Sequence, residues 1–302
     1  MLEIIKASVH NHPVIDVMVP THDRLDMTMR CINSIYSSTR MPFHCIVVDD
    51  STDGITPNYF RELVTKGVKP LNKITNLTFI HSDEPYKEGN QFFNIALRHM
   101  KSEYMATVMN SMRLEPDWEL MPVESIFPNN PEIGLIGCKC LFEDNGRIES
   151  AGIKMYKYLP TDMGRDAPAH RMLGVYDCDA VQWAFAIVRR KAALGNLQEG
   201  VFHGFKGWDD IDNSFSVKAK GWRIVTCGMS IGYHAPRATR GANTEEAARQ
   251  NSENGERFYK RWGLWNTFIA DHPGYKTGES LAAPVGDTIH APPKGMEHFI
   301  TA

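Results

Sequence analysis

Short apolar stretches and amphipathic helical stretches alternate along the first third of the sequence. Strand character is found at residues 14–19, 45–48, 77–80 and 104–109. Between them, apolar residues recur at helical spacing, first from Leu25 to Tyr36 and later from Phe93 to Met100. This β–α alternation predicts an α/β fold with a mainly parallel central sheet and helices on both of its faces.

Polar clusters follow three of the expected strands, at residues 21–24, 49–53 and 110–113. In sheets of parallel strands, ligands bind outside the carboxyl ends of the strands. We therefore expect these clusters to meet at one edge of the sheet and to form a binding site.

Three carboxylates crowd into four positions at Asp209, Asp210 and Asp212, directly after Gly207 and Trp208. The apolar spacing that follows predicts a helix whose first turn holds these acids. Capping is the simple explanation, because acids stabilise helix N-termini, and it accounts for one or two of them. An acid at a loop–helix junction is also well placed to act as a general base.

The second half is less regular. Strands are expected at residues 133–137, 181–188, 223–226 and 233–234, with a hairpin turn at residues 143–146. Residues 154–171 mix basic and aromatic residues with proline and glycine, which is typical of a long surface loop with a binding role. A charged helix is expected at residues 243–262, and an extended tail from about Asp271.

The composition is that of an ordinary soluble globular protein: 302 residues, 42% hydrophobic and 23% charged, with a net charge of −3. This charge gives no global attraction to nucleic acid or membrane. We see no apolar run long enough to span a bilayer and no signal-peptide core, so a cytoplasmic protein is expected. Cys138 and Cys140 share a face of one expected strand and are interpreted as buried, reduced thiols.

Several segments, in order, resemble the family 2 glycosyltransferases of the GT-A fold, whose central sheet is Rossmann-like. The segments are residues 19–24 (VPTHDR), 46–54 (IVVDDSTDG), 88–94, 133–152 and 207–234. The resemblance covers roughly residues 14 to 265. It implies a nucleotide-sugar-binding half at 1–126, an acceptor-binding and catalytic half at 127–242, and a C-terminal helix and tail at 243–302.

The resemblance also implies roles for single residues. It assigns the donor to Pro20, Thr21, Asp23, Arg24, Asp49, Asn94, Asn110, Ser111, Arg237 and Arg240. Asp49 would accept a hydrogen bond from the base, although Asx turns explain Asp49 and Asp53 nearly as well. Asp210 matches the family's general base, with Asp209 the nearest alternative, and a single base implies inversion. Trp183 and Trp208 are acceptor-binding candidates, and Trp208 could equally be a core aromatic residue.

The metal site departs from the family pattern. Met112 stands where the usual Asp-x-Asp motif ends in an acid, and a thioether suits Mn²⁺ or Mg²⁺ poorly. Asn110 and His234 remain as candidate ligands, although a lone histidine is often a core residue. We expect a divalent metal that arrives mainly with the nucleotide, and arginines such as Arg113 could replace it.

The expected activity is transfer of a sugar, from a UDP-sugar, to a hydroxyl acceptor. A glycan is favoured as the acceptor, and a modified nucleobase or nucleic acid is possible. Two alternatives stay open: an inactive nucleotide-sugar-binding protein, because the Asp-x-Asp position is degenerate, and a nucleotidyltransferase. The second lacks support, because residues 20–24 contain no glycine for a phosphate loop. The sequence leaves the oligomeric state open.

Overall fold

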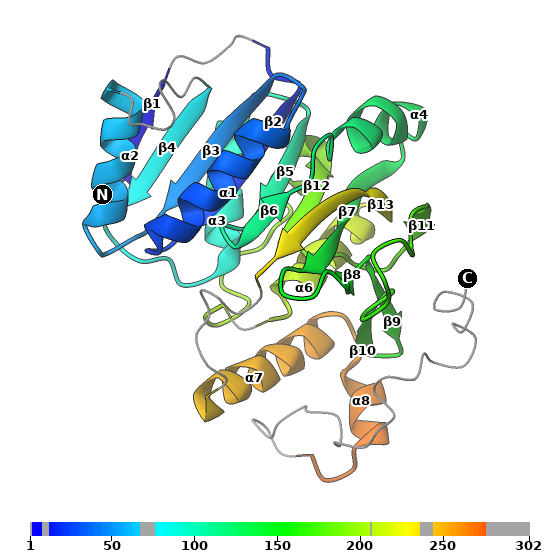
Figure 1. The fold of residues 1–302 in the computed structure, drawn as a ribbon. Helices are drawn as coiled ribbons and strands as arrows, with labels where there is room; N and C mark the ends of the chain where they lie inside the picture. The colour runs from blue at the N-terminus through cyan, green and yellow to red at the C-terminus, as the bar shows by residue number, and fades with distance from the viewer. Residues whose placement is uncertain (1, 8–11, 67–75, 206, 236–243, 276–302) are drawn as a thin grey trace.

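The computed structural model describes residues 2–7, 12–66, 76–205, 207–235 and 244–275. Within these ranges the protein forms an 11-stranded sheet and a separate two-stranded hairpin (Figure 1). The strands are β1 (Leu2–Lys6), β2 (Ile15–Thr21), β3 (Phe43–Asp49), β4 (Leu77–Ser82), β5 (Tyr104–Val108), β6 (Met112–Leu114), β7 (Ile133–Phe142), β8 (Ile148–Ser150), β9 (Ile153–Tyr156), β10 (Leu159–Asp162), β11 (Val175–Asp177), β12 (Phe185–Arg189) and β13 (Arg223–His234).

The sheet has the order β1-β4-β3-β2-β5-β12-β7-β13-β11, with β6 paired to β13 and β8 to β7. Strands β4, β3, β2 and β5 run parallel, as the alternation in the sequence predicted. Strand β12 is antiparallel to both β5 and β7, and so joins the two halves of the chain in one sheet. The expected α/β class, with a mainly parallel central sheet, is confirmed.

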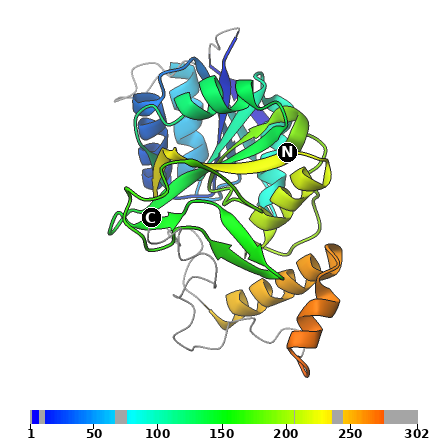
Figure 2. The ribbon, with the colours of Figure 1, turned by 90° about the vertical axis from the view of Figure 1, so that its right-hand side faces the viewer.

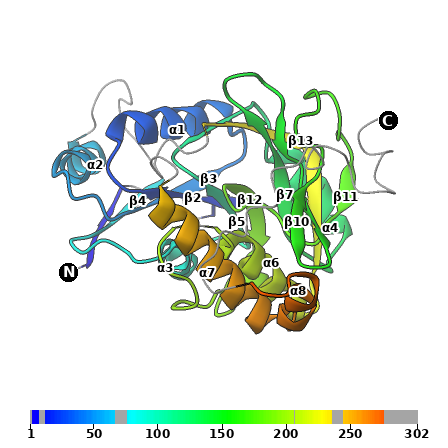
Figure 3. The same ribbon diagram turned by 90° about the horizontal axis from the view of Figure 1, so that it is seen from below.

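Helices cover both faces of the sheet. They are α1 (Leu25–Ser38), α2 (Ile55–Lys66), α3 (Gly89–His99), α4 (Phe127–Asn129), α5 (Arg190–Ala193), α6 (Asp209–Ala219), α7 (Glu245–Arg261) and α8 (Trp265–Asp271), with a π-helical turn η1 (Met121–Ile126). Helices α1 and α2 lie on one side of the parallel strands, and α3, α6 and α7 on the other (Figure 3). Helices α7 and α8 form a pair at the far end of the molecule from α4 (Figures 1 and 2).

Each face of the sheet has its own apolar core, because alternate residues of a buried strand point to opposite faces. In β3, Val47 packs into the core under α1 and α2, and Val48 into the core under α3. A third, largely aromatic cluster joins α6 to α7 and α8. All six cysteines are buried free thiols, as expected for Cys138 and Cys140.

Three expectations for the second half need correction. Residues 154–171 contain the β9–β10 hairpin rather than a continuous loop, and its turn places Lys157 at a left-handed φ of 57°. The two stretches expected at 223–226 and 233–234 are one strand, β13, interrupted by a bulge. Strand β12 begins at Phe185, later than expected. Residues 276–302 of the expected tail lie outside the described residues.

In the part of the chain that the structure describes, no helix combines the length and the apolar character needed to cross a bilayer.

Candidate active site

Two pockets adjoin at the carboxyl ends of the strands, where the polar clusters were expected to meet. One pocket, of about 500 Å³, lies between the ends of β2 and β3, the start of α3 and the segment before α6. We call it the donor-side pocket because Pro20 and Thr21, expected from the sequence to bind the donor, line it. The second pocket, of about 630 Å³, lies between the turn after β5, the β7–β8 turn and the ends of α6 and β13. Met109 and Asn110 line both pockets and form their shared wall.

The two consecutive aspartates at the end of β3, Asp49 and Asp50, have different surroundings. Asp49 is 0% exposed; its carboxylate accepts hydrogen bonds from Ser51 Oγ at 2.5 Å and from His81 Nδ1 at 2.6 Å. Asp50, not Asp49, lines the donor-side pocket. The structure therefore places Asp50 at the pocket wall, whereas the carboxylate of Asp49 is hydrogen-bonded inside the protein.

Asp50 is held by two donors. The backbone N–H of Tyr86 donates to Asp50 Oδ2 at 2.6 Å, and His22 Nδ1 lies 2.9 Å from Asp50 Oδ1. Burial raises the pKa of the Asp50 carboxyl, and its hydrogen-bond donors offset this only in part. Burial lowers the pKa of His22, but the hydrogen bond and charge of Asp50 outweigh that effect, so the net pKa is raised.

The donor-binding residues expected on the first loop divide between pocket and scaffold. Pro20 and Thr21 line the donor-side pocket, and Thr21 Oγ1 is buried without a hydrogen-bond partner among the described residues. Asp23 instead joins two loops: its Oδ1 accepts from the backbone N–H groups of Thr52, at 2.9 Å, and of Asp53, at 3.1 Å.

Two other residues expected to bind the donor, Arg24 and Asn94, have partners away from these pockets. Arg24 forms an ion pair with Asp26 at the start of α1, with 3.4 Å between Nε and Oδ1. The amide of Asn94 donates to the backbone carbonyl of Leu197 at 2.9 Å, so it anchors the segment before α6. Neither Arg24 nor Asn94 is among the described lining residues. Arg237 and Arg240 lie outside the described residues.

The three acids at the start of α6 have three different environments. A left-handed residue, Trp208 with φ 72°, precedes the helix and turns the chain sharply. Asp209 then lines the donor-side pocket, and Asp210 lines the second pocket. Asp212 points into the protein, where its Oδ1 accepts from Trp262 Nε1 at 2.7 Å and pairs with Arg261 Nε at 2.9 Å. Capping alone therefore does not explain this cluster.

Both tryptophans expected to bind the acceptor pack against other aromatic side chains. Trp183 is 0% exposed, with its ring centroid 5.2 Å from that of Phe93, and no acceptor can reach it. Trp208 packs against Phe258 and Tyr259, with centroids 5.2 and 5.1 Å away. The core alternative considered for Trp208 is thus the one that its contacts favour.

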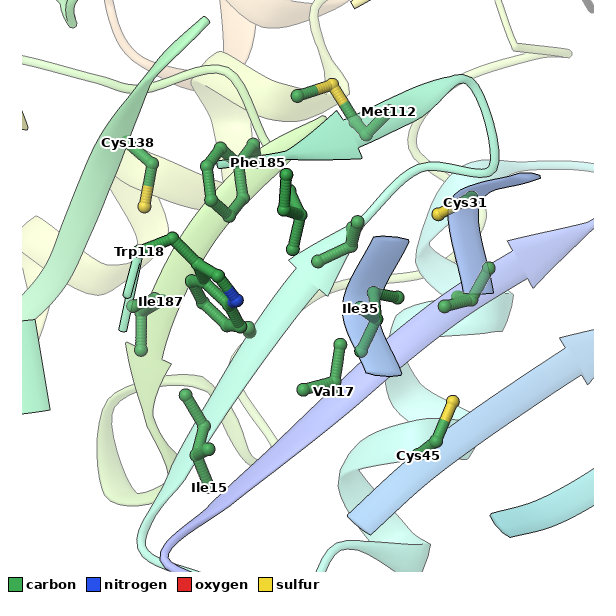
Figure 4. Close-up of a cluster of buried hydrophobic side chains, with 14 of the residues drawn as sticks. Ile15, Val17, Cys31, Ile35, Cys45, Met112, Trp118, Cys138, Phe185 and Ile187 are labelled. Atoms are coloured by element: carbon green, nitrogen blue, oxygen red, sulfur yellow. The ribbon is translucent and has the colours of Figure 1, made fainter. Parts of the chain in front are cut away.

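The degenerate metal motif has a structural explanation. Met112 belongs to β6, which pairs with β13, and its side chain is 0% exposed in the core beside Phe185 (Figure 4). Its register partner His234 lines the second pocket, and His234 Nδ1 lies 2.7 Å from Glu149 Oε2. An imidazole held through Nδ1 leaves Nε2 available as a ligand, an arrangement common in metal sites.

The second pocket also contains residues that the sequence did not single out. Asn110 and Ser111, both expected to bind the donor, line it, and Glu149, Arg165 and Gln182 join them. The Arg165 guanidinium lies 5.2 Å from the centroid of the Phe142 ring. Arg165 belongs to the basic segment expected to have a binding role, but Glu149 is a single acid in a strand and gave no signal.

The comparisons with known proteins agree with this fold. Residues 16–118 match the model of glycosyl transferase family 2. The O-antigen biosynthesis protein RfbC of Myxococcus xanthus is 25% identical over 254 residues, which are 79% of this chain and 18% of that protein. The uncharacterized protein y4gI of Sinorhizobium fredii is also 25% identical, over 93% of this chain and 30% of its own length. The chain thus spans less than a third of the length of these curated relatives.

Two solved structures share the fold. GalNAc-T7 with UDP, GalNAc and Mn²⁺ aligns with a TM-score of 0.63 and 14% identity, over 91% of this chain and 53% of that one. A mannosyltransferase from Pyrobaculum calidifontis, PcManGT in complex with GDP-Man and Mn²⁺, aligns with a TM-score of 0.56 and 17% identity, over 85% and 66%. The protein has the GT-A fold of these two transferases. The family 2 match lies in residues 16–118, the part of the chain that holds the first two sequence motifs.

Proposed function

We propose that the protein transfers a sugar from a UDP-sugar to a hydroxyl of a glycan, with inversion at the anomeric carbon. The main support is the pair of pockets that share Met109 and Asn110, with the consecutive residues Asp209 and Asp210 lining one each. Sugar transfer needs a donor and an acceptor in adjoining spaces, with a base on the acceptor side. The two pockets have that arrangement.

The nucleoside of the donor would lie in the donor-side pocket. Asp50 would accept a hydrogen bond from an N–H of the base, and the buried Thr21 hydroxyl would gain the partner it otherwise lacks. Tyr86, which also lines this pocket, keeps its hydroxyl neutral because burial raises its pKa to about 12. GalNAc-T7 is described with UDP and PcManGT with GDP-Man. We favour UDP because it is the commonest nucleotide of the family.

The chemical step assigns the base to Asp210. Its carboxylate would take the proton of the acceptor hydroxyl as that oxygen bonds to the anomeric carbon. The bond from this carbon to the diphosphate oxygen breaks, and the nucleoside diphosphate leaves with the electron pair. Attack opposite the leaving group gives inversion. Asp209, on the donor side, would contact the donor instead, and it serves as a base only if Asp210 does not.

The charge of the second pocket favours a neutral glycan over a nucleic acid as the acceptor. Its described acidic residues are Asp144, Glu149, Asp166 and Asp210, and they outnumber the basic residues Arg165 and His234. Nucleic-acid binding depends on neutralising phosphates with basic side chains. A pocket with this excess of carboxylates would repel a phosphodiester and would accept the hydroxyls of a sugar.

The residues present fit a divalent ion only in part. His234, oriented through Glu149, and Asn110 could each supply one ligand. The described residues contain no group of three His, Cys, Asp or Glu side chains able to hold an ion. The remaining ligands would therefore come from the diphosphate and from water. A bound Mn²⁺ or Mg²⁺ would offset the charge of the leaving diphosphate.

Calorimetry with UDP and with GDP, followed by assays of UDP release from UDP-sugars with simple glycosides as acceptors, tests this function. We expect UDP to bind and NMR of the product to show the inverted anomer. Absence of binding to either nucleotide, with or without Mn²⁺, would refute the proposal, and a retained anomeric configuration would refute the role of Asp210.

A further inference from the structure

A buried lysine lies in β7, the strand whose last residue, Phe142, lines the second pocket, and it has no part in the chemistry proposed above. Lys139, in β7, is 0% exposed. Its ammonium donates hydrogen bonds to the backbone carbonyls of Ala169, at 2.8 Å, and of Arg171, at 3.2 Å. In the described ranges no carboxylate forms an ion pair with it, and burial lowers its pKa to about 8.

A bulge in the neighbouring strand adjoins this lysine. Cys227 of β13 is in register with Cys138 and Ile231 with Lys139, so residues 228–230 of β13 have no counterparts on β7. A Cβ at Gly228 would overlap the carbonyl oxygen of Met172, and the Gly228 N–H donates to the Gly174 carbonyl at 2.9 Å, so residues 172–174 lie directly on the bulge. Only glycine permits this close approach.

The segment held in this way also reaches the second pocket. Arg165 and Asp166 line that pocket, and the backbone N–H of Asp166 donates to Ile148 of β8 at 2.8 Å. Ile148 in turn donates to the carbonyl of Ala167 at 2.9 Å. Residues 166–167 are therefore held to β8 by backbone hydrogen bonds, and residues 169–171 are held to β7 by the side chain of Lys139.

We propose that Lys139 is a positioning residue for the acceptor: by holding residues 169–171, it fixes Arg165 and Asp166 at the wall of the second pocket. This inference rests on the proposed role of that pocket. An unpaired ammonium is costly to bury, and an apolar side chain would pack in the same core without that cost. A lysine at this position is explained if residues 169–171, which it holds, must keep one position.

The test compares Lys139→Met, which has a similar length and no donor, with Lys139→Gln, which keeps a neutral donor. Lys220→Met, at an exposed lysine, is the matched control. In Lys139→Met, hydrogen exchange of the backbone of residues 168–174 should rise about tenfold, while α1 keeps its protection. Lys139→Gln should restore part of that protection. Calorimetry on both variants should give a UDP affinity within about twofold of that of the unmodified protein.

Kinetics separate positioning from a general loss of structure. With methyl α-glycosides as acceptor probes, Lys139→Met should raise the acceptor KM about tenfold and change kcat less. Adding Lys139→Met to Arg165→Ala should raise KM no further, because both changes would remove the same contact.

Unchanged exchange of residues 168–174 in Lys139→Met overturns the proposal, and so does an equal rise in exchange throughout the protein. If Lys139→Met does not fold, the same measurements on Lys139→Gln decide. Failure of the unmodified protein to bind UDP would count against the proposed function alone, because the exchange measurement needs no ligand.

Discussion

Replacing Asp49 and Asp50, at the end of β3, by alanine one at a time should give two different phenotypes. Asp49 is enclosed by Ser51 and His81, and Asp50 faces the donor-side pocket. We expect Asp49→Ala to lower stability with little effect on nucleotide affinity per folded molecule. Asp50→Ala should weaken nucleotide binding more than it lowers stability.

The magnitudes follow from the groups that lose a partner. Asp49→Ala leaves the buried imidazole of His81 and the hydroxyl of Ser51 unsatisfied, at about 1–3 kcal/mol each. Burial raises the pKa of Asp49, so removing this carboxylate recovers part of its desolvation cost. The net loss is about 2–4 kcal/mol, or a fall in Tm of about 5–10 °C.

For Asp50→Ala, the unsatisfied group is the backbone N–H of Tyr86, at about 1–2 kcal/mol, because the half-exposed His22 can turn to water. Losing a hydrogen bond from the base to a charged acceptor should raise the Kd for UDP about 10- to 100-fold. Thermal unfolding and UDP calorimetry on both variants give the two numbers. An Asp49→Ala variant with normal stability and lost UDP binding would refute this reasoning and restore the role first expected for Asp49.

Three further outcomes are expected. Asp210→Asn should bind UDP normally and lower the transfer rate about 100-fold or more, whereas normal turnover with an inactive Asp209→Asn would move the base to Asp209. Activity should fall in EDTA and return with Mn²⁺ or Mg²⁺, and His234→Ala should raise the metal concentration required; full activity after exhaustive dialysis against EDTA would contradict this. The pKa of His22 is raised by Asp50, so this pair should stabilise the fold below pH 6.5 and lose its effect as pH rises through the raised pKa. The Tm difference between the original protein and His22→Asn should therefore become smaller as pH rises. A Tm difference that does not depend on pH would show that the His22–Asp50 pair is not its cause.

The parallel half of the fold could be predicted from the sequence because its signals are local. Apolar runs such as 45–48 ended in polar clusters, and the helix spacing between them was regular. The β9–β10 hairpin gave no such signal, because Lys157 occupies its left-handed turn position in place of the usual glycine or asparagine. The sequence therefore indicated a loop.

The site was predictable at the level of segments and not of single side chains. Asp49 and Asp50 are adjacent, so strand alternation separates their directions, but only the packing of His81 and Tyr86 decides which one faces the pocket. Likewise, Asp212 accepts a hydrogen bond from Trp262, which lies far along the chain. Local pattern contains no information about partners so distant in sequence.

The burial of all six cysteines makes the native protein inert toward thiol reagents. The reactive species is the thiolate, and burial raises the pKa of every one of these thiols, from Cys31 to Cys227. A cysteine introduced at Asp144, exposed on the turn at the rim of the second pocket, would consequently be the single site for a fluorescent label. Acceptor binding could then be followed by fluorescence without first replacing any native cysteine.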